Sequence, residues 1–159
     1  MSRYGPETLG DTMPEPTRRP AGQILRSYGM RQVGRFFLRN EGFIIEIEDG
    51  QVSDLIESIY VFAIDDEITR IGCSAAPLGD RFRRWQRDIT GALRGLRTQT
   101  PPWEAIEWKR RLEAFGEGQI FAKQAHEVTT SPVGPFRALL DEERILIARH
   151  RPSLNRSHR

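Results

Sequence analysis

Residues 58–73 read SIYVFAIDDEITRIGC and carry the most informative pattern of the sequence. Residues 58–64 and 68–73 are rich in β-branched and aromatic side chains, which favour strands. The polar run DDE at 65–67 is typical of a tight turn between antiparallel strands. The segment therefore predicts a β-hairpin.

The register of this hairpin places a tyrosine and an arginine on one face. Centring the turn on Asp66 predicts three cross-strand pairs: Ile64 with Ile68, Phe62 with Arg70, and Tyr60 with Gly72. Because alternate side chains of a strand share a face, Tyr60 and Arg70 project from the same side, and Gly72 leaves space beside the phenol. A slip of one residue would reverse this arrangement.

An amphipathic helix is predicted directly after the hairpin. Pro77 suits the first turn of a helix, and the apolar residues that follow form a stripe at helical spacing: Leu78, Phe82, Trp85, Ile89 and Leu93. Arg83, Arg84 and Arg87 project opposite the stripe, while Arg81 lies at its border. Arg81 is therefore the arginine best placed to reach a site at the edge of the core, and Trp85 is most simply a core residue.

The remaining elements are predicted from weaker patterns. We expect a broken helix over 24–38, a strand over 42–48, a helix over 103–115 ended by Gly116, a strand over 119–128 and a last helix over 135–150. Residues 1–20 contain four prolines and no apolar periodicity, which predicts a disordered arm.

The last predicted helix carries a carboxylate in an apolar stripe. Its inward positions are predicted to be 136, 139, 140, 143, 146, 147 and 150, and position 143 is a glutamate. A carboxylate among apolar neighbours is costly unless it is paired, protonated or bound to a cation. Asp141 and Glu142 lie off the stripe, so we expect them to be solvated.

Length and composition fit one globular domain without disulfides. The chain has 159 residues, of which 38% are hydrophobic, and Cys73 is its only cysteine, which excludes an intrachain disulfide and a multi-cysteine zinc site. No run approaches the ~20 apolar residues that a membrane helix needs, and the start at Met1 lacks a signal-peptide pattern. We therefore expect a cytoplasmic protein that does not enter a membrane.

The net charge of +2 conceals a polarised distribution. Residues 41–69 hold nine carboxylates and no Lys or Arg, whereas residues 144–159 hold five arginines and no carboxylate. Of the 24 cationic residues, 22 are arginine, which grips phosphate through paired donors. The arginine preference is compatible with a nucleic-acid partner, although genomic base composition explains it equally well.

Four segments together resemble a known family. Ser58-Ile59-Tyr60, nine residues, and Arg70-Ile71-Gly72 resemble the paired motifs of the GIY-YIG nuclease superfamily. Arg81 resembles the family's arginine, and Glu143-x-x-Leu146-Ile147 followed by Pro152-x-x-Asn155 resembles its metal-binding glutamate helix and terminal asparagine. The resemblance covers residues 58–156, about two thirds of the chain.

The resemblance implies a fold and a division of the chain. It implies an α/β (α+β) domain over 58–159, with a small three-stranded antiparallel sheet flanked by helices. The arm at 1–20 and an N-terminal extension at 21–57 precede this domain.

The resemblance also implies a DNA endonuclease that uses one divalent cation, Mg²⁺ or Mn²⁺, held by Glu143. Arg81 would clamp the scissile phosphate, Tyr60 would orient or deprotonate the attacking water, and Arg70 would supply a further phosphate contact. Further DNA contacts are expected from Gly72, Arg84, Arg151 and Asn155. Duplex DNA is the expected partner, and cutting both strands with one site would require a homodimer or two successive nicks.

Departures from the family pattern leave alternatives open. Arg70 stands where the second motif has tyrosine and cannot accept a proton, so a DNA-binding relative with impaired chemistry is the alternative function. Tyr60 would then be a strand aromatic with a hydrogen-bonded hydroxyl, and Arg81 and Glu143 an ion pair at the core edge. Asn155 fits a tether of the C-terminal backbone better than a metal contact. His126 and His150 match no family position and are expected to be structural.

Overall fold

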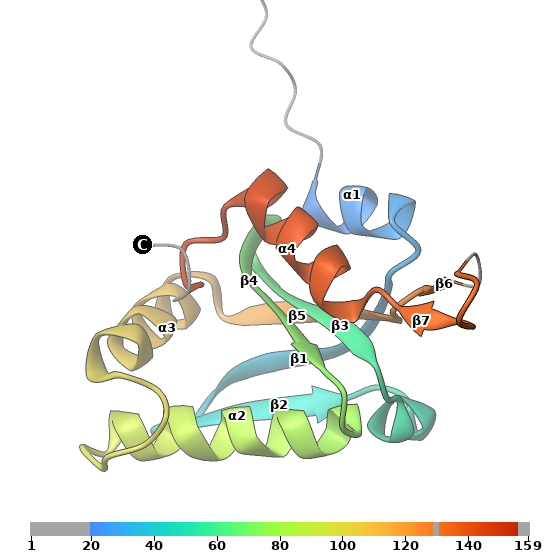
Figure 1. The fold of residues 1–159 in the computed structure, drawn as a ribbon. Coiled ribbons are helices and arrows are strands. Elements are labelled where there is room, and N and C mark those ends of the chain that lie inside the picture. The colour runs from blue at the N-terminus through green and yellow to red at the C-terminus, as the bar shows by residue number, and fades with distance from the viewer. Residues whose placement is uncertain (1–19, 129–130, 156–159) are drawn as a thin grey trace, which may run out of the picture.

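A computed structural model describes residues 20–128 and 131–155 of the chain. The structure has three layers, with a five-stranded antiparallel sheet between two pairs of helices (Figure 1). The strands lie in the order β2-β1-β5-β3-β4. The strand bounds are Arg31–Arg39 (β1), Gly42–Ile47 (β2), Ser58–Ile64 (β3), Glu67–Ser74 (β4) and Glu117–Gln124 (β5).

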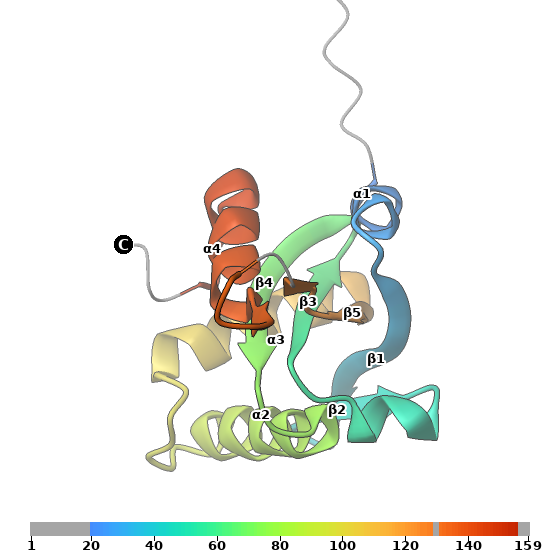
Figure 2. The same ribbon diagram turned by 45° about the vertical axis from the view of Figure 1, so that its right-hand side comes forward.

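Each face of the sheet is covered by two helices, as the rotated view shows (Figure 2). Helices α2 (Leu78–Leu93) and α3 (Pro102–Phe115) cover one face, and α1 (Ala21–Ser27) and α4 (Leu139–His150) cover the other. A short 3₁₀ helix, η1 (Gly50–Asp54), packs beside α2, and a separate hairpin joins β6 (Glu127–Val128) to β7 (Phe136–Arg137). None of the helices in the described ranges is long and apolar enough to cross a bilayer.

The predicted hairpin is confirmed as β3 and β4, with the expected pairs at Tyr60–Gly72 and Phe62–Arg70. The turn differs from the prediction because Asp65 and Asp66 both have positive φ, the geometry of a two-residue hairpin loop. Ile64 therefore pairs with Glu67, and a bulge after Phe62 restores the expected register toward the site. The predicted Ile64–Ile68 pair is wrong.

The three-stranded sheet is also wrong, because two further strands come from residues 31–47. The predicted broken helix over 24–38 is helical only in α1. After Gly29, which has a φ of 85°, the chain continues as β1. Strand β1 pairs with both β2 and β5, and this pairing outweighs the loose helical period of its apolar residues.

The expected arm over residues 1–20 lies outside the described residues apart from Pro20. The predicted division of the chain at residue 57 stays a prediction.

Two C-terminal boundaries differ from the predictions. The strand expected over 119–128 separates into β5 and β6, and the helix expected from Pro135 begins at Leu139. Phe136 instead pairs with Val128 in the β6–β7 hairpin, where it is exposed. Helix α2 matches its prediction, since Leu78, Phe82, Trp85 and Ile89 are buried and Leu93 is partly buried.

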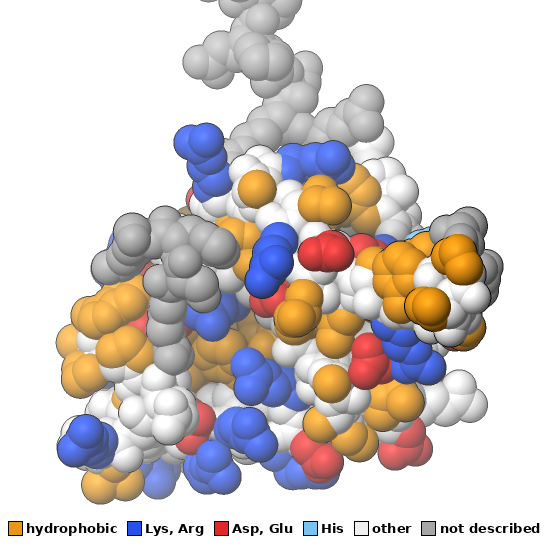
Figure 3. All heavy atoms as spheres, in the orientation of Figure 1, with side chains coloured by type: hydrophobic (Ala, Val, Ile, Leu, Met, Phe, Trp, Pro, Cys, Tyr) orange, Lys and Arg blue, Asp and Glu red, His pale blue; other side chains and the backbone are white. Residues whose placement is uncertain are grey.

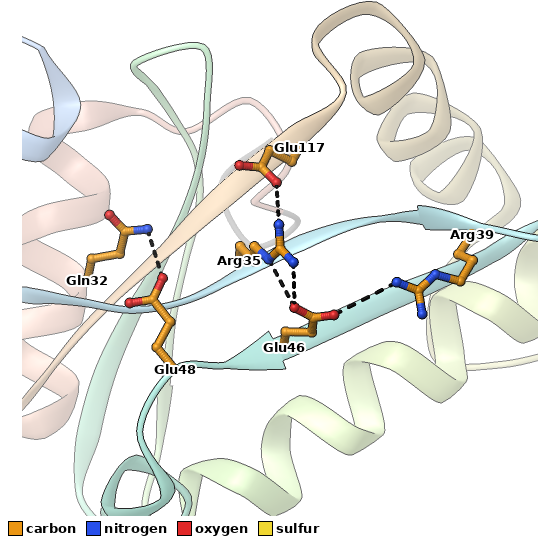
Figure 4. Close-up of polar contacts among 6 residues, drawn as sticks. All are labelled: Gln32, Arg35, Arg39, Glu46, Glu48 and Glu117. Atoms are coloured by element: carbon orange, nitrogen blue, oxygen red, sulfur yellow. Dashed lines mark hydrogen bonds and ion pairs between the residues drawn. The ribbon is translucent and has the colours of Figure 1, made fainter.

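Part of the acidic stretch, the carboxylates of β2, lies at the opposite edge of the sheet from β4. On β1 and β2, Arg35 contacts Glu46 with two nitrogens, at 2.8 and 3.0 Å, and reaches Glu117 on β5 at 3.1 Å (Figure 4). Arg39 also approaches Glu46, at 3.9 Å. Exposed pairs of this kind contribute little stability each, but they neutralise part of the predicted acidic surface.

The chain after α4 protects the exposed side of edge strand β4. The Asn155 side chain donates to the Ile71 carbonyl at 2.8 Å and accepts from the Ile71 amide at 2.9 Å. The Leu154 amide donates to the Thr69 carbonyl at 3.1 Å. Asn155 is therefore a tether of the C-terminal backbone, and its amide is occupied by the strand.

We predict that Asn155→Ala destabilises the protein by about 2 kcal/mol, because the Ile71 amide and carbonyl lose their partners in a buried setting. Urea denaturation of the variant and of Ser153→Ala, a change at an exposed neighbour, measures the difference. Equal stabilities for the two variants would contradict the tether.

Candidate active site

Tyr60 lies in the core beneath α2, with 0% of its surface exposed. Its ring packs edge-on against Phe62 and Phe82, with centroids 5.6 Å away in each case. Its hydroxyl accepts a hydrogen bond from Arg81 Nε at 3.0 Å and another from Trp85 Nε1 at 2.8 Å. Because Arg81 and Trp85 are four residues apart on one helix, both donors reach the same oxygen.

Gly72 gives the phenol its space, as the register predicted. A Cβ atom at this position would overlap the Tyr60 hydroxyl and ring carbons. Any other residue would displace Tyr60, so Gly72 shapes the site by having no side chain.

Arg81 is half-buried at the border of the apolar stripe, as predicted. Burial alone would lower the pKa of this guanidinium. The Tyr60 hydroxyl and the acidic groups of Cys73 and Glu143 outweigh burial, so the pKa of Arg81 is raised above its ordinary value. The side chain is a permanent cation at the edge of the core.

Glu143 approaches the same region from α4, on the other face of the sheet. Its Oε2 accepts a hydrogen bond from Cys73 Sγ at 2.9 Å. Burial and this carboxylate raise the pKa of the Cys73 thiol to about 12, whereas Arg81 acts in the opposite direction. The thiol is therefore a protonated donor to Glu143 at neutral pH.

The stripe predicted around Glu143 is partly correct. Leu139, Leu146 and Ile147 are buried, but Leu140 is exposed and Glu143 itself is only half-buried. Arg81 and Glu143 do not form the ion pair that we considered, since no contact within 4 Å joins them in the described part of the chain. Their charges instead act on Cys73 from the two sides of β4.

Arg70 is held in a buried ion pair that the sequence did not reveal. Its Nη1 donates to Glu104 Oε1 on α3 at 2.9 Å and to the Leu154 carbonyl at 2.6 Å. The side chain of Glu104 is 0% exposed, and the Arg70 guanidinium lies 4.9 Å from the Trp85 ring centroid. No local sequence pattern indicates the role of Glu104, because its partner Arg70 is 34 residues away in the chain.

Four arginines line a pocket of about 540 Å³ beside this network. Basic side chains surround a hollow on the face that Figure 3 shows. The residues lining it are Arg70, Arg81, Arg84, Trp85, Arg87, Asp88, Gln99 and Thr100. Of the predicted DNA contacts, Arg84 lies in this pocket. Arg151 does not, since it lines a separate pocket between α4 and the following chain, together with Asn155.

Glu142 is not the solvated residue that the stripe predicted. Its carboxylate contacts Lys123 Nζ at 2.5 Å and accepts from the His126 amide at 2.6 Å. Burial would raise its pKa, but the hydrogen bonds from Lys123 and His126 outweigh burial and lower it. The pair anchors α4 to β5 next to Glu143.

His150 bonds to the Tyr28 hydroxyl, away from this region.

The capacity of the site for a metal rests on one carboxylate. Residues 20–128 and 131–155 contain no group of three or more His, Cys, Asp or Glu side chains that could hold an ion. A single half-exposed carboxylate suits a cation that keeps most of its waters, such as Mg²⁺, and does not suit zinc. The role of Glu143 as a cation ligand stays a prediction.

Comparison with known proteins identifies the fold. No protein-family model matches the sequence, and no curated protein matches it. A mutant of bacteriophage T4 EndoII aligns with a TM-score of 0.63 and 17% identity, covering 87% of this chain and 100% of that one. The chain shares the EndoII fold. The restriction endonuclease HPY188I in complex with product DNA aligns with a TM-score of 0.48 and 16% identity, over 80% of this chain and 79% of that one.

We predict that native Cys73 is alkylated by iodoacetamide about a thousandfold more slowly at pH 8 than in the urea-unfolded chain. A pKa of about 12 leaves about one thiol in ten thousand ionised, against about a quarter for an ordinary thiol. Because Cys73 is the only cysteine, mass spectrometry reads the reaction directly.

Glu143→Gln should accelerate this alkylation only in part, because burial is the larger cause of the raised pKa. Native labelling as fast as that of the unfolded chain would contradict the geometry at Cys73.

Proposed function

We propose that the protein is a divalent-metal-dependent DNA endonuclease with a GIY-YIG-type site. The observation that carries the proposal is the position of two charged side chains: Glu143 of α4 accepts a hydrogen bond from Cys73 on β4, and Arg81 of α2, whose charge acts on the same thiol, lines a pocket with three further arginines. This combination offers one cation ligand and several phosphate donors near one edge of the sheet.

The proposed division of labour follows from the positions of the side chains. Glu143 would hold Mg²⁺ or Mn²⁺, and the bound cation would supply an activated water and neutralise charge on the phosphate. Arg81 would bind the scissile phosphate, and Arg84 and Arg87 would bind the DNA backbone beside it. Arg151, at the C-terminal end of α4, would contact a different phosphate. With one such site per chain, a monomer would nick one strand of duplex DNA, and a homodimer could cut both.

The fold supports the same proposal. Bacteriophage T4 EndoII, whose name marks it as an endonuclease, aligns over its whole length. The predicted motif residues Tyr60, Gly72 and Arg81 lie together in this chain, as residues of one site should.

A DNA-binding relative without catalysis is the second candidate, and Arg70 favours it. This residue stands in the second motif, cannot accept a proton, and is held by Glu104 and the Leu154 carbonyl. Such a protein would retain the arginine pocket and bind DNA without cutting it.

A plasmid-nicking assay distinguishes these functions. We predict that the wild type nicks supercoiled DNA with Mg²⁺ or Mn²⁺ and that a chelator abolishes the reaction. Glu143→Ala should lose about a thousandfold or more in rate because the cation ligand is removed, while DNA affinity changes little because the arginines of the pocket remain. Asp141→Ala, an exposed carboxylate on the same helix, is the matched control.

Binding without nicking under either metal would favour the second candidate. If the wild type neither binds nor nicks DNA, both candidate functions are overturned.

Salt dependence tests the arginine pocket. We predict that Arg84→Ala lowers the slope of log K against log salt by about 0.9 on duplex DNA, the value for one lost phosphate contact. Arg83 is the matched control, because it is exposed on α2, pairs with Asp80 and does not line the pocket. Fluorescence anisotropy at several salt concentrations measures both slopes, and equal slopes for the two variants would exclude the pocket from the DNA path.

A further inference from the structure

Tyr60 is enclosed on every side in the structure. Its side chain is fully buried, and its hydroxyl is covered by Arg81 and Trp85 from α2 and by the close approach of Gly72. A general base must reach the proton that it removes, directly or through one water. A hydroxyl with no exposed surface that already accepts two N–H groups has no such access.

The contact with Tyr60 determines how the Arg81 guanidinium is presented. Only Nε of Arg81 bonds to the phenol, and in the described part of the chain its terminal nitrogens have no hydrogen-bond or ion-pair partner. Phosphate is gripped best by two parallel donors, which Nη1 and Nη2 provide. The hydrogen bond at Nε therefore orients the guanidinium and leaves Nη1 and Nη2 available to bind phosphate. Arg81 also lines the arginine pocket.

We propose that Tyr60 is a positioning residue rather than a base, and that Trp85 and Tyr60 together aim Arg81 at the phosphate. This inference rests on the proposed function and deepens it. It replaces the expected role of Tyr60 with one that its burial allows. Trp85 becomes part of the site and not only of the core.

The surroundings make Trp85 a rigid support. Its indole N–H holds the phenol at 2.8 Å, and the Arg70 guanidinium lies 4.9 Å from its ring centroid. Arg70 is itself fixed by Glu104. This chain of contacts from α3 to Arg81 also gives the arginine in the second motif a role that needs no proton transfer.

The test compares Tyr60→Phe and Trp85→Phe with Trp108→Phe. Trp108 is an equally suitable tryptophan for the control, because it is fully buried in the same core and its indole N–H has no hydrogen-bond partner among the described residues. Melting temperatures are measured for all three, and the kinetics of DNA nicking are followed between pH 6 and 9.

We expect Tyr60→Phe and Trp85→Phe each to lower kcat/KM about tenfold, the loss for one hydrogen bond to a charged or buried polar group, with the wild-type pH profile retained. Trp108→Phe should match Trp85→Phe in melting temperature but nick at the wild-type rate. If Tyr60 is a base, Tyr60→Phe should instead lose about a hundredfold or more and remove one limb of the pH profile, with Trp85→Phe much less affected. That result would overturn the proposal, as would equal activity losses in Trp85→Phe and Trp108→Phe.

DNA affinity keeps this inference separate from the proposed function. Binding of a short duplex is measured with chelator present, where no cutting occurs. Tyr60→Phe and Trp85→Phe should weaken binding several-fold, and Trp108→Phe should not. If the wild type binds without nicking, the endonuclease proposal fails while this pattern of affinities still supports the aiming of Arg81. If all three variants bind like the wild type, the positioning role is overturned, whether or not the wild type nicks DNA.

Discussion

Strand β3 is buried along its whole length, and the rest of the structure depends on that constraint. Its alternate side chains enter two separate cores, with Tyr60 and Phe62 facing α2 and α3, and Ile59 and Val61 facing α1 and α4. The backbone of β3 is paired along both edges, with β5 on one side and β4 on the other. Helices are then required on both faces to cover its apolar side chains.

The candidate site follows from this arrangement because β4 is an edge strand. A residue of β4 can be approached from the α2 face and from the α4 face at the same point, since no further strand lies beyond it. Arg81 and Glu143 use these two approaches, and both influence the thiol of Cys73. In the proposed function, Arg81 would donate to phosphate on one side of β4 and Glu143 would bind the cation on the other.

The same edge is closed on its open side by the chain that follows α4. Asn155 occupies both backbone groups of Ile71, and Arg70 binds the Leu154 carbonyl. Unpaired strand edges invite association with other chains, so this closure protects the sheet where the site lies. The ion pair with Glu104, which is fully buried, holds Arg70 in the position from which it makes this contact. A buried guanidinium and carboxylate tolerate this position because each has the other.

Four features could be predicted from the sequence alone: the hairpin, its Tyr60–Gly72 pairing, the stripe of α2 and the border position of Arg81. Side chains repeat every two residues in a strand and every 3.6 residues in a helix, so local patterns in the sequence predict these features. Three others became visible only in the folded chain: β1 and β2 extend the sheet, Tyr60 is fully enclosed, and Cys73 contacts Glu143. Those outcomes depend on contacts between residues tens of positions apart, which no local period encodes, and on the packing of two helices against opposite faces of one strand.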